Sequence, residues 1–406
     1  MEQTLHRPVA VWPPRSWDFG QLILAADYYN ADLAVARAKL QTAQAAVISA
    51  GARPNPTLAF SPSYDTAAEP GISPWTLGFT LDLPIETAGK RGYRIAEARH
   101  LANAASLEVA SVGWQVRSRL RDSLVQLEAA ERRQRILSRQ LEAGSEAARL
   151  LMDRARVGEA STTEVAVVRI AADQAALQLQ DAHEQTAQAR LTVAAALGLP
   201  GTALDGVRLN LAALDTLPSP DRAAPSREQA LLDRTDVLAA LADYQASDSA
   251  LRLEVARQYP DLQLGPGYSR GYTVRDLEKS LTVGVSLTLP ILNHNRGPIA
   301  EAEGRRREAA ANFDAVQARA AAQVDAAASG YRASLAKLET ADRLLDEQRS
   351  RMTSAQALFG AGEMDRLTLE QGRSELATDE LARLQAFTQA QLALGALESA
   401  MQHPHP

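Results

Sequence analysis

Histidine and cysteine are the residue types that would most directly reveal a metal site or a catalytic centre, and this chain of 406 residues contains no cysteine. Its six histidines are scattered, at His6, His100, His183, His294, His403 and His405. None forms an i, i+4 pair on a predicted helix or has a carboxylate at ligand spacing. The HPHP ending is interpreted as a frayed terminus. With no Ser-His-Asp set, phosphate loop or paired carboxylates recognisable, the sequence predicts no enzyme, no cofactor and no metal site.

Acidic residues beside glycine, in ARVGEASTTE and FGAGEMDRLT, are the remaining candidates. Gly158 and Gly362 are expected to reverse the chain between two helices, because glycine reaches positive φ cheaply. Ser161 to Glu164 form a capping-box motif, so Glu164 is expected to satisfy backbone donors at a helix start. Asp365 is a candidate N-cap of the same kind. Capping does not prevent these carboxylates from having a second role.

The elements that position these two tips are repeated along the chain. The stretch LDLPIETAGKRG, residues 81–92, is echoed as LTLPILNHNRG, residues 287–297. Many separated matches share an offset of 204, among them Asp32 with Asp236, Leu58 with Leu262, Tyr64 with Tyr268 and Gly158 with Gly362. The Leu-Pro-Ile copies differ by 206, which indicates a two-residue insertion between the strands of the second copy. The chain is therefore an internal duplication.

Five segments follow from this duplication: an N-terminal extension (1–26), a first repeat (27–198), a linker rich in Pro, Asp and Gly (199–227), a second repeat (228–398) and a tail (399–406). Each repeat is predicted to contain an Ala-rich helix, two strands, a long helix, a tip and a return helix. The predicted strands are about 57–65 and 74–83, then 262–270 and 280–289, and the tips are about 156–161 and 359–365. The fold class is thus mainly α with a small β part.

Charge and hydropathy narrow the class of protein. The net charge of -6 gives no electrostatic footprint for nucleic acid. Leu338, Leu345, Met352 and Phe359 recur every seventh residue, as in packed long helices. No stretch approaches the ~20 apolar residues of a membrane-spanning helix, and the start lacks a signal-peptide pattern. Taken literally this predicts a soluble cytoplasmic protein, unless a leader was removed or the true start lies upstream.

The predicted strands argue against a soluble protein. Apolar residues alternate with Thr, Gly, Ser and Asp in the second strand of each repeat, at Trp75, Leu77, Phe79 and Leu81 and at Leu281, Val283, Val285 and Leu287. Such alternation gives one apolar and one polar face, which also suits a strand packed on a soluble core. However, about 9 residues is close to the length that crosses a bilayer. Four strands cannot close a barrel, so copies of the chain must share strands, eight in a dimer or twelve in a trimer with a lumen.

At these places the motifs PNPTL, LDLPIETAGKRGYRIAEA, RVGEAS, QYPDL, LTLPILNHNRG and GAGEMD resemble the TolC-type outer membrane efflux proteins. The resemblance extends from about Asp27 to Leu397 and is closest to the heavy-metal, cobalt-zinc-cadmium branch. It implies a homotrimer whose protomers each give four strands to a twelve-stranded β-barrel in outer membrane lipid of a Gram-negative bacterium, with an α-helical periplasmic tunnel. It also implies a periplasmic adaptor and a proton-driven inner membrane pump as partners, with heavy-metal cations as cargo.

The resemblance further implies that the tips dock the adaptor and narrow the lumen, through Gly158, Glu159, Glu164, Gly362, Glu363 and Asp365. The family's acidic residue six positions after the tip glycine is matched by Glu164 but replaced by Thr368 in the second repeat. Glu363, Asp365 and Glu370 are its possible substitutes. Arg154 and Arg156 are expected to be solvated, and Lys90, Arg91 and Arg296 to meet the polar boundary of the membrane.

Three alternatives stay open. A soluble coiled-coil scaffold fits the helix content and the missing leader. A periplasmic adaptor also has a helical hairpin, but the duplication disfavours it. A channel of the same family for drugs, organic solutes or secreted polypeptides differs only in cargo.

Overall fold

The computed structural model describes residues 16–220, 227–272 and 276–403, and the chain divides into two compact units. One, here called the sheet unit, comprises residues 36–109 and 236–317. The other, the hairpin unit, comprises the residues before Ala36, residues 110–235 and the residues from Ala318 onward. The duplication therefore folds with each repeat contributing to both units.

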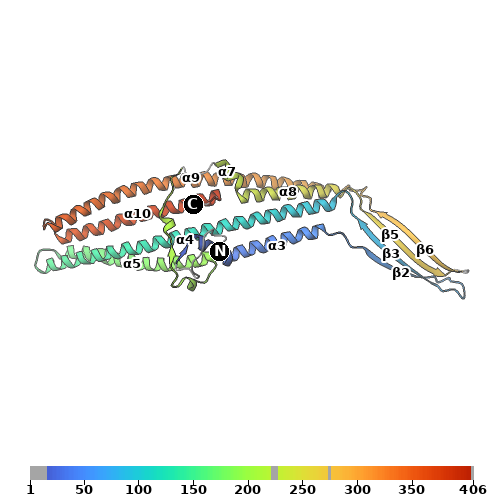
Figure 1. Ribbon diagram of the computed structural model, residues 1–406, viewed down its shortest axis with the longest axis horizontal. Helices are drawn as coiled ribbons and strands as arrows, with labels where there is room; N and C mark the ends of the chain where they lie inside the picture. Colours follow the sequence, from blue (N-terminus) through green and yellow to red (C-terminus); the bar gives the residue numbers. More distant parts are fainter. Residues whose placement is uncertain (1–15, 221–226, 273–275, 404–406) are drawn as a thin grey trace. The chain divides into compact units, whose positions relative to one another are not determined.

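The element order matches the predicted duplication (Figure 1). The first repeat contains α2 (Phe19–Tyr29), α3 (Ala31–Gly51), β2 (Thr57–Tyr64), β3 (Trp75–Ile85), α4 (Lys90–Arg156) and α5 (Thr162–Leu197). The second contains α7 (Arg227–Asp233), α8 (Thr235–Ala256), β5 (Leu262–Tyr272), β6 (Leu277–Leu287), α9 (Arg296–Gly360) and α10 (Arg366–Met401). Two short helical turns, η1 (Gly201–Leu204) and η2 (Ala212–Asp215), lie in the predicted linker, where β4 (Leu209–Asn210) pairs in parallel with β1 (Trp17–Asp18).

Proline and left-handed residues set the helix boundaries in the sheet unit. The helix α3 ends before the Pro54 and Pro56 of RPNP, and α8 ends before Pro260, because proline and the residue before it resist helix. Each strand-to-helix turn uses two successive residues at positive φ, Ala88 and Gly89 in one repeat and His294 and Asn295 in the other. His294 is thus a turn residue in the structure.

The sheet unit contains a four-stranded antiparallel sheet in the order β2-β3-β5-β6. The second hairpin is longer than predicted at its loop end, since β5 continues to Tyr272 and β6 begins at Leu277 instead of about residue 280. Residues 270–272 pair with residues 277–279, so the hairpin extends into the segment between the two predicted strands. β6 also stops at Leu287, short of the predicted residue 289. Among the residues that the structure describes, the outer strands β2 and β6 each have one edge without a partner strand.

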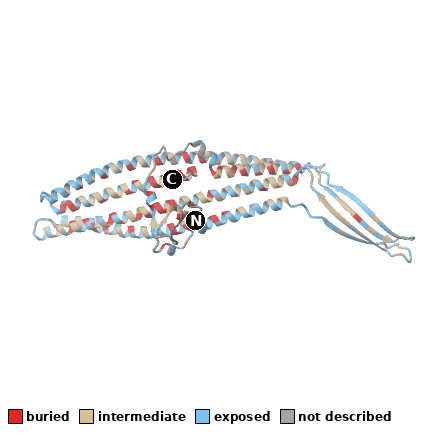
Figure 2. Ribbon diagram, viewed as in Figure 1, coloured by how far each residue is buried: buried red, intermediate tan, exposed pale blue. Residues whose placement is uncertain are grey.

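One face of the sheet, here called the apolar face, carries large apolar side chains in register across all four strands. Leu58 lies opposite Leu81, and Phe60 opposite Phe79 with ring centroids 4.9 Å apart. Val283 on β6 is 70% exposed, and apart from Gly267 no residue of the four strands is buried (Figure 2). The described helices of the sheet unit therefore leave the sheet largely uncovered, unlike a sheet packed on a soluble core.

The opposite face, here called the small face, is made of Gly, Ser, Thr and Ala with few larger residues. Its side chains lean over the glycines: a Cβ at Gly267 would lie 2.7 Å from Oγ1 of Thr282. A Cβ at Gly271 would lie equally close to Oγ1 of Thr76. A larger residue at either position would therefore require the neighbouring threonine side chain to move.

The hairpin unit is held by packed long helices. In α9 the predicted heptad residues Leu338, Leu345 and Met352 are buried, whereas Phe359 beside the tip is exposed. The largest buried cluster joins α2, α4 and α5 with the linker, through residues such as Leu124, Leu197 and Leu214. Within the described part of the chain, none of the helices has a stretch that is long and apolar enough to cross a membrane.

A buried polar network fastens the linker to both repeats. Arg121 of α4 donates to the backbone oxygen and the side-chain Oε1 of Gln391 on α10, at 2.6 and 2.9 Å. The amide of Gln391 in turn donates to the backbone oxygens of Leu214 and Thr216. Glu398, also buried, lies 3.4 Å from Nε of Arg121. One arginine thus connects the first repeat, the second repeat and the linker.

Candidate functional site

Both tips reverse the chain through a left-handed glycine. The φ angles of Gly158 and Gly362 are +82° and +76°. The following residues close the helix ends, since Glu159 N donates to Arg154 O and Glu363 N to Leu358 O, each at 2.9 Å. This six-to-one bond is the helix-ending arrangement that glycine favours. The two tips are therefore built in the same way in both repeats.

Glu164 caps the helix that leaves the first tip, as the motif predicts. Its backbone N donates to Ser161 Oγ at 3.1 Å, and its carboxylate accepts from the backbone N and the hydroxyl of Ser161 at 2.7 and 2.8 Å. These hydrogen bonds from Ser161 hold the pKa of Glu164 below its usual range. The carboxylate is exposed and charged at neutral pH, so capping leaves it accessible to a partner or to ions.

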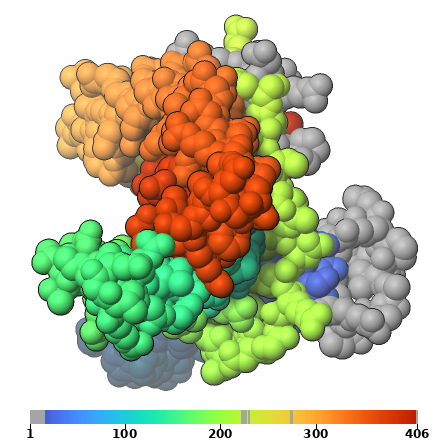
Figure 3. All heavy atoms as spheres, turned by 90° about the vertical axis from the view of Figure 1, so that its left-hand side faces the viewer, coloured from blue at the N-terminus to red at the C-terminus, as the bar shows by residue number. Residues whose placement is uncertain are grey.

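Asp365 does more than cap the second tip. Its Oδ1 accepts from Thr368 N at 2.7 Å, and its Oδ2 lies 3.0 Å from Nη2 of Arg154 in the first tip. The bonds from Thr368 and from Arg154 lower the pKa of Asp365. Figure 3 looks onto the end of the molecule at which the two tips lie next to each other. Arg154, expected to be solvated, is partly exposed and also bridges the two repeats.

Glu159 and Glu363 lie directly after the tip glycines. Both are exposed, and neither makes an ion pair within the described residues. Together with Glu164 they give the tips three accessible carboxylates.

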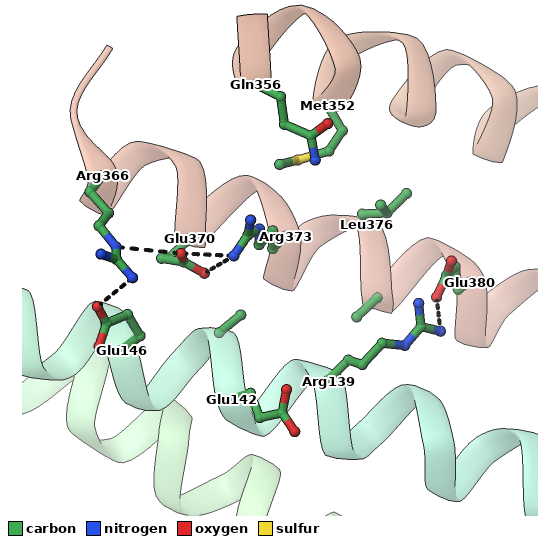
Figure 4. A pocket seen from close by; sticks show the side chains of 12 residues that line it. Arg139, Glu142, Glu146, Met352, Gln356, Arg366, Glu370, Arg373, Leu376 and Glu380 are labelled. Atoms are coloured by element: carbon green, nitrogen blue, oxygen red, sulfur yellow. Dashed lines mark hydrogen bonds and ion pairs between the residues drawn. The ribbon is translucent and has the colours of Figure 1, made fainter. Parts of the chain in front are cut away.

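Glu370, one of the suggested substitutes for the missing acid at Thr368, is placed differently. It lines a cavity of about 520 Å³ between α4, α9 and α10 (Figure 4). It is only 3% exposed and lies 3.0 Å from Arg373. Arg366 beside it pairs with Glu146 of α4 at 3.1 Å. Glu370 is thus buried in an intrachain ion-pair network, which leaves Glu363 and Asp365 as candidates for an exposed acidic residue.

The strand residues predicted to face lipid all lie on the apolar face. They are Trp75, Leu77, Phe79 and Leu81 on β3 and Leu281, Val283, Val285 and Leu287 on β6, and all except the half-buried Leu81 are exposed. The two basic residues of the sheet, Arg270 and Lys279, lie opposite each other on this face near the β5–β6 loop. The guanidinium of Arg270 lies 5.9 Å from the ring of Tyr272.

Two carboxylates on the small face were not singled out from the sequence. Asp82 and Glu278 occupy even-numbered positions of β3 and β6, and the small face carries no Lys or Arg in its described strands. The alternation that identified the apolar residues also contained this signal, because it assigns Asp82 to the polar parity.

The turn from β3 into α4 is locked onto the second repeat. Nζ of Lys90 lies 2.8 Å from Oδ1 of Asp261 and donates to Tyr259 O at 2.7 Å. Thr87 donates to Asp261 through its backbone N at 2.9 Å. Burial alone would raise the pKa of Asp261, but the bonds from Lys90 and Thr87 outweigh it and lower the pKa. Lys90 is buried, so the expectation that it meets the membrane boundary is wrong.

The described part of the chain contains no candidate metal-binding site. No group of three or more His, Asp or Glu side chains gathers there at metal-binding distance. His6 and His405 lie outside the described residues.

Asp365→Ala is expected to fray the first turn of α10, because it removes both the N-cap and the bridge to Arg154. Loss of an N-cap costs about 1 kcal/mol. Hydrogen exchange of the amides of residues 366–369 measures this, with Arg154→Ala as a control that keeps the cap. The pKa of Asp365 is depressed, so its contribution is complete above the unfolded value of about 3.9 and is lost as pH falls through the folded value. Unchanged protection in Asp365→Ala would contradict the capping role.

Comparison with known proteins matches this architecture. A family model described as outer membrane efflux protein matches residues 22–199 and 227–402. The cobalt-zinc-cadmium resistance protein CzcC of Cupriavidus metallidurans is 25% identical over 268 residues, 66% of this chain. That alignment spans 62% of CzcC, less than two thirds of its length. The pyoverdine export outer membrane protein OpmQ of Pseudomonas aeruginosa is 27% identical over 398 residues, 90% of this chain and 82% of OpmQ.

A solved structure has the same fold. The outer-membrane channel OprN superimposes with a TM-score of 0.78 at 20% identity, over 95% of this chain and 90% of that one. These matches confirm the resemblance inferred from the motifs, the predicted fold class and the expectation of a Gram-negative outer membrane channel instead of an enzyme. The chain therefore belongs to the outer membrane efflux protein family.

Proposed function

We propose that this protein is the outer membrane channel of a tripartite efflux system, a passive exit duct formed by three copies of the chain. The observation that carries the proposal is the sheet, with one exposed apolar face, one small polar face and two unpaired edges. Large apolar side chains exposed along four strands fit lipid better than water. Open strand edges are not tolerated in lipid, so the edges must pair with those of other copies.

Three copies supply the twelve strands of a barrel wide enough to hold water. The apolar face then contacts outer membrane lipid, and the small face lines the lumen. Residues such as Gly267 and Thr282 keep that wall polar and free of bulky side chains.

The tips are the proposed docking surface for a periplasmic adaptor that connects the channel to a proton-driven inner membrane pump. Glu159, Glu164 and Glu363 are exposed there, and a partner with basic or amide donors would complement them. The glycines Gly158 and Gly362 give both tips the same backbone shape, so an adaptor meets two similar tips on every copy.

The proposed cargo is heavy-metal cations. Three-fold symmetry would turn Asp82 and Glu278 into two acidic rings on a lumen wall whose described strands carry no Lys or Arg, and acidic rings favour cations. The similarity to the cobalt-zinc-cadmium resistance protein supports the same cargo. An organic solute is the second candidate, because the alignment with a pyoverdine exporter covers 90% of this chain.

Export by living cells tests both the channel and the tip. A Gram-negative strain that lacks its own metal-efflux channel is given this chain with its cognate adaptor and pump, and cellular zinc and cadmium are measured after a metal load. The wild-type chain should lower both metals, and Gly362→Val should abolish export while the trimers stay intact. Gly362 needs positive φ, which strains a β-branched residue.

Gly360→Val is the matched control, since Gly360 lies in the helix two residues earlier with open space around it. It should retain export. Unheated and heated gel samples of detergent extracts report the trimer for each variant. Normal export by Gly362→Val would remove the tip from the docking site, and export of pyoverdine but not of zinc or cadmium would favour the second cargo.

A further inference from the structure

We propose that β6 of one copy pairs with β2 of the next copy in one particular register, with Leu289 opposite Phe60 and Ser286 opposite Ser63. This inference rests on the ring of copies proposed above, and it specifies the residues at the contact between them. It follows from the duplication, because the chain already contains one contact of the same kind.

The first step is the equivalence between the strands of the two repeats. Residues of β2 correspond to residues of β5 at an offset of 204, as Leu58 does to Leu262. Residues of β3 correspond to β6 and its continuation at an offset of 206, as Leu83 does to Leu289.

The structure validates this equivalence within the hairpins. Leu58 pairs with Leu81 in the first hairpin, and their equivalents Leu262 and Leu287 pair in the second. Phe60 pairs with Phe79, and the equivalent residues, 264 and 285, pair likewise. The pairing rule of one repeat therefore transfers to the other without a shift.

The second step uses the contact between the repeats. β3 ends the first repeat's hairpin and β5 begins the second's, and these strands pair in the middle of the sheet. The strands with one unpaired edge among the described residues are β6, which ends the second hairpin, and β2, which begins the first. In a head-to-tail ring the same contact recurs between copies, with β6 in the place of β3 and the neighbour's β2 in the place of β5.

Transferring the internal pairs gives the pairs between copies. Leu83 opposite Leu264 becomes Leu289 opposite Phe60, and Thr80 opposite Gly267 becomes Ser286 opposite Ser63. Ile85 opposite Leu262 likewise becomes Ile291 opposite Leu58. The same register, continued between these pairs, sets Thr288 opposite Ser61 and Leu287 opposite Pro62.

The exposed end of β6 supports this register independently. β3 continues to Ile85 because β5 pairs with it there, whereas the equivalent strand β6 ends at Leu287. Beyond that end, Leu289 and Ile291 are 58% and 66% exposed. The predicted register gives both of them apolar partners on β2 and lengthens β6 to match β3.

Both faces of the sheet remain continuous across this contact. Large apolar residues meet on one side, and Ser286 and Thr288 meet Ser63 and Ser61 on the other. A slip of one residue would place apolar side chains on the small face. A slip of two residues keeps the faces, so an experiment must separate it from the proposed register.

Cysteine pairs make that separation, because the natural chain contains no cysteine. Ser286→Cys with Ser63→Cys, and Thr288→Cys with Ser61→Cys, place sulfurs on directly opposite residues within disulfide reach. Ser286→Cys with Ser61→Cys is the control, two residues out of register and displaced by about 6.7 Å along the strand. β2 and β6 are the outer strands of the four, so a disulfide between these positions joins two chains.

After oxidation in membranes, the two predicted pairs should leave most chains as covalent dimers and trimers that survive boiling and disappear on reduction. Chains with the control pair should run as monomers after boiling. Cross-linking of the control in preference to the predicted pairs, or a trimer in which neither predicted pair cross-links, overturns the register and leaves the channel proposal standing. A cysteine-free chain that never forms a trimer overturns the proposed ring, and the register with it.

Discussion

Val283→Lys is expected to prevent assembly of the chain in the outer membrane. Val283 lies in the middle of β6 on the apolar face and is 70% exposed in the isolated chain. A lysine on the lipid side of a barrel strand costs about 2 to 4 kcal/mol near the bilayer midplane. Each copy of a homotrimer would carry this cost, so the amount of heat-sensitive trimer in the outer membrane fraction should fall sharply.

Thr282→Lys is the control for this experiment. Thr282 is the preceding residue of the same strand, at the same depth, but it belongs to the small face. Its lysine would point toward the proposed water-filled lumen, and the trimer should assemble. Equal amounts of trimer in both variants, at wild-type level, would count against a lipid-facing β6.

The local patterns of the sequence predicted the elements well because each has a short-range cause. Proline in RPNP and QYP ended the helices α3 and α8, and glycine at Gly158 and Gly362 reversed the chain. Alternation of residue types assigned the faces of β3 and β6 correctly. The duplication added a check, because each assignment could be made twice.

Strand ends were less predictable because partners determine them. β6 was expected over 280–289 and is observed over Leu277–Leu287. At the loop end, Lys279 lies in strand since Arg270 of β5 lies opposite it. At the other end, Leu289 lies outside the strand, and no residue of the described chain pairs with it.

Local sequence patterns could not predict the contacts between the repeats. Arg154 with Asp365, and Lys90 with Asp261, join residues far apart in the chain, and no local motif marks them. Glu370 was suggested as an exposed acid from its place near the tip, yet it is buried among arginines. Charged residues near a predicted tip can therefore serve the packing of the repeats as readily as a docking surface.

The network around Arg121 is the strongest case of such a contact, and Arg121→Ala is expected to destabilise the hairpin unit by about 3 to 5 kcal/mol. Arg121 is buried, and it donates to Gln391 and lies beside Glu398. Removing it would leave the Glu398 carboxylate buried without its cation. Denaturant unfolding of the detergent-solubilised protein, followed by far-UV circular dichroism, measures the loss.

Arg119→Ala is the matched control on the same helix. Arg119 is paired with Asp32 at 2.6 Å, but both side chains are more than half exposed, and such pairs contribute about 0 to 1 kcal/mol. The double variant Arg121→Met with Glu398→Leu should unfold later than Arg121→Ala, because it removes the buried charges together. If Arg121→Ala lowered the free energy of unfolding no more than Arg119→Ala does, the buried arginine would contribute little. The linker and the two repeats would then be held by apolar packing around Leu124, Leu197 and Leu214.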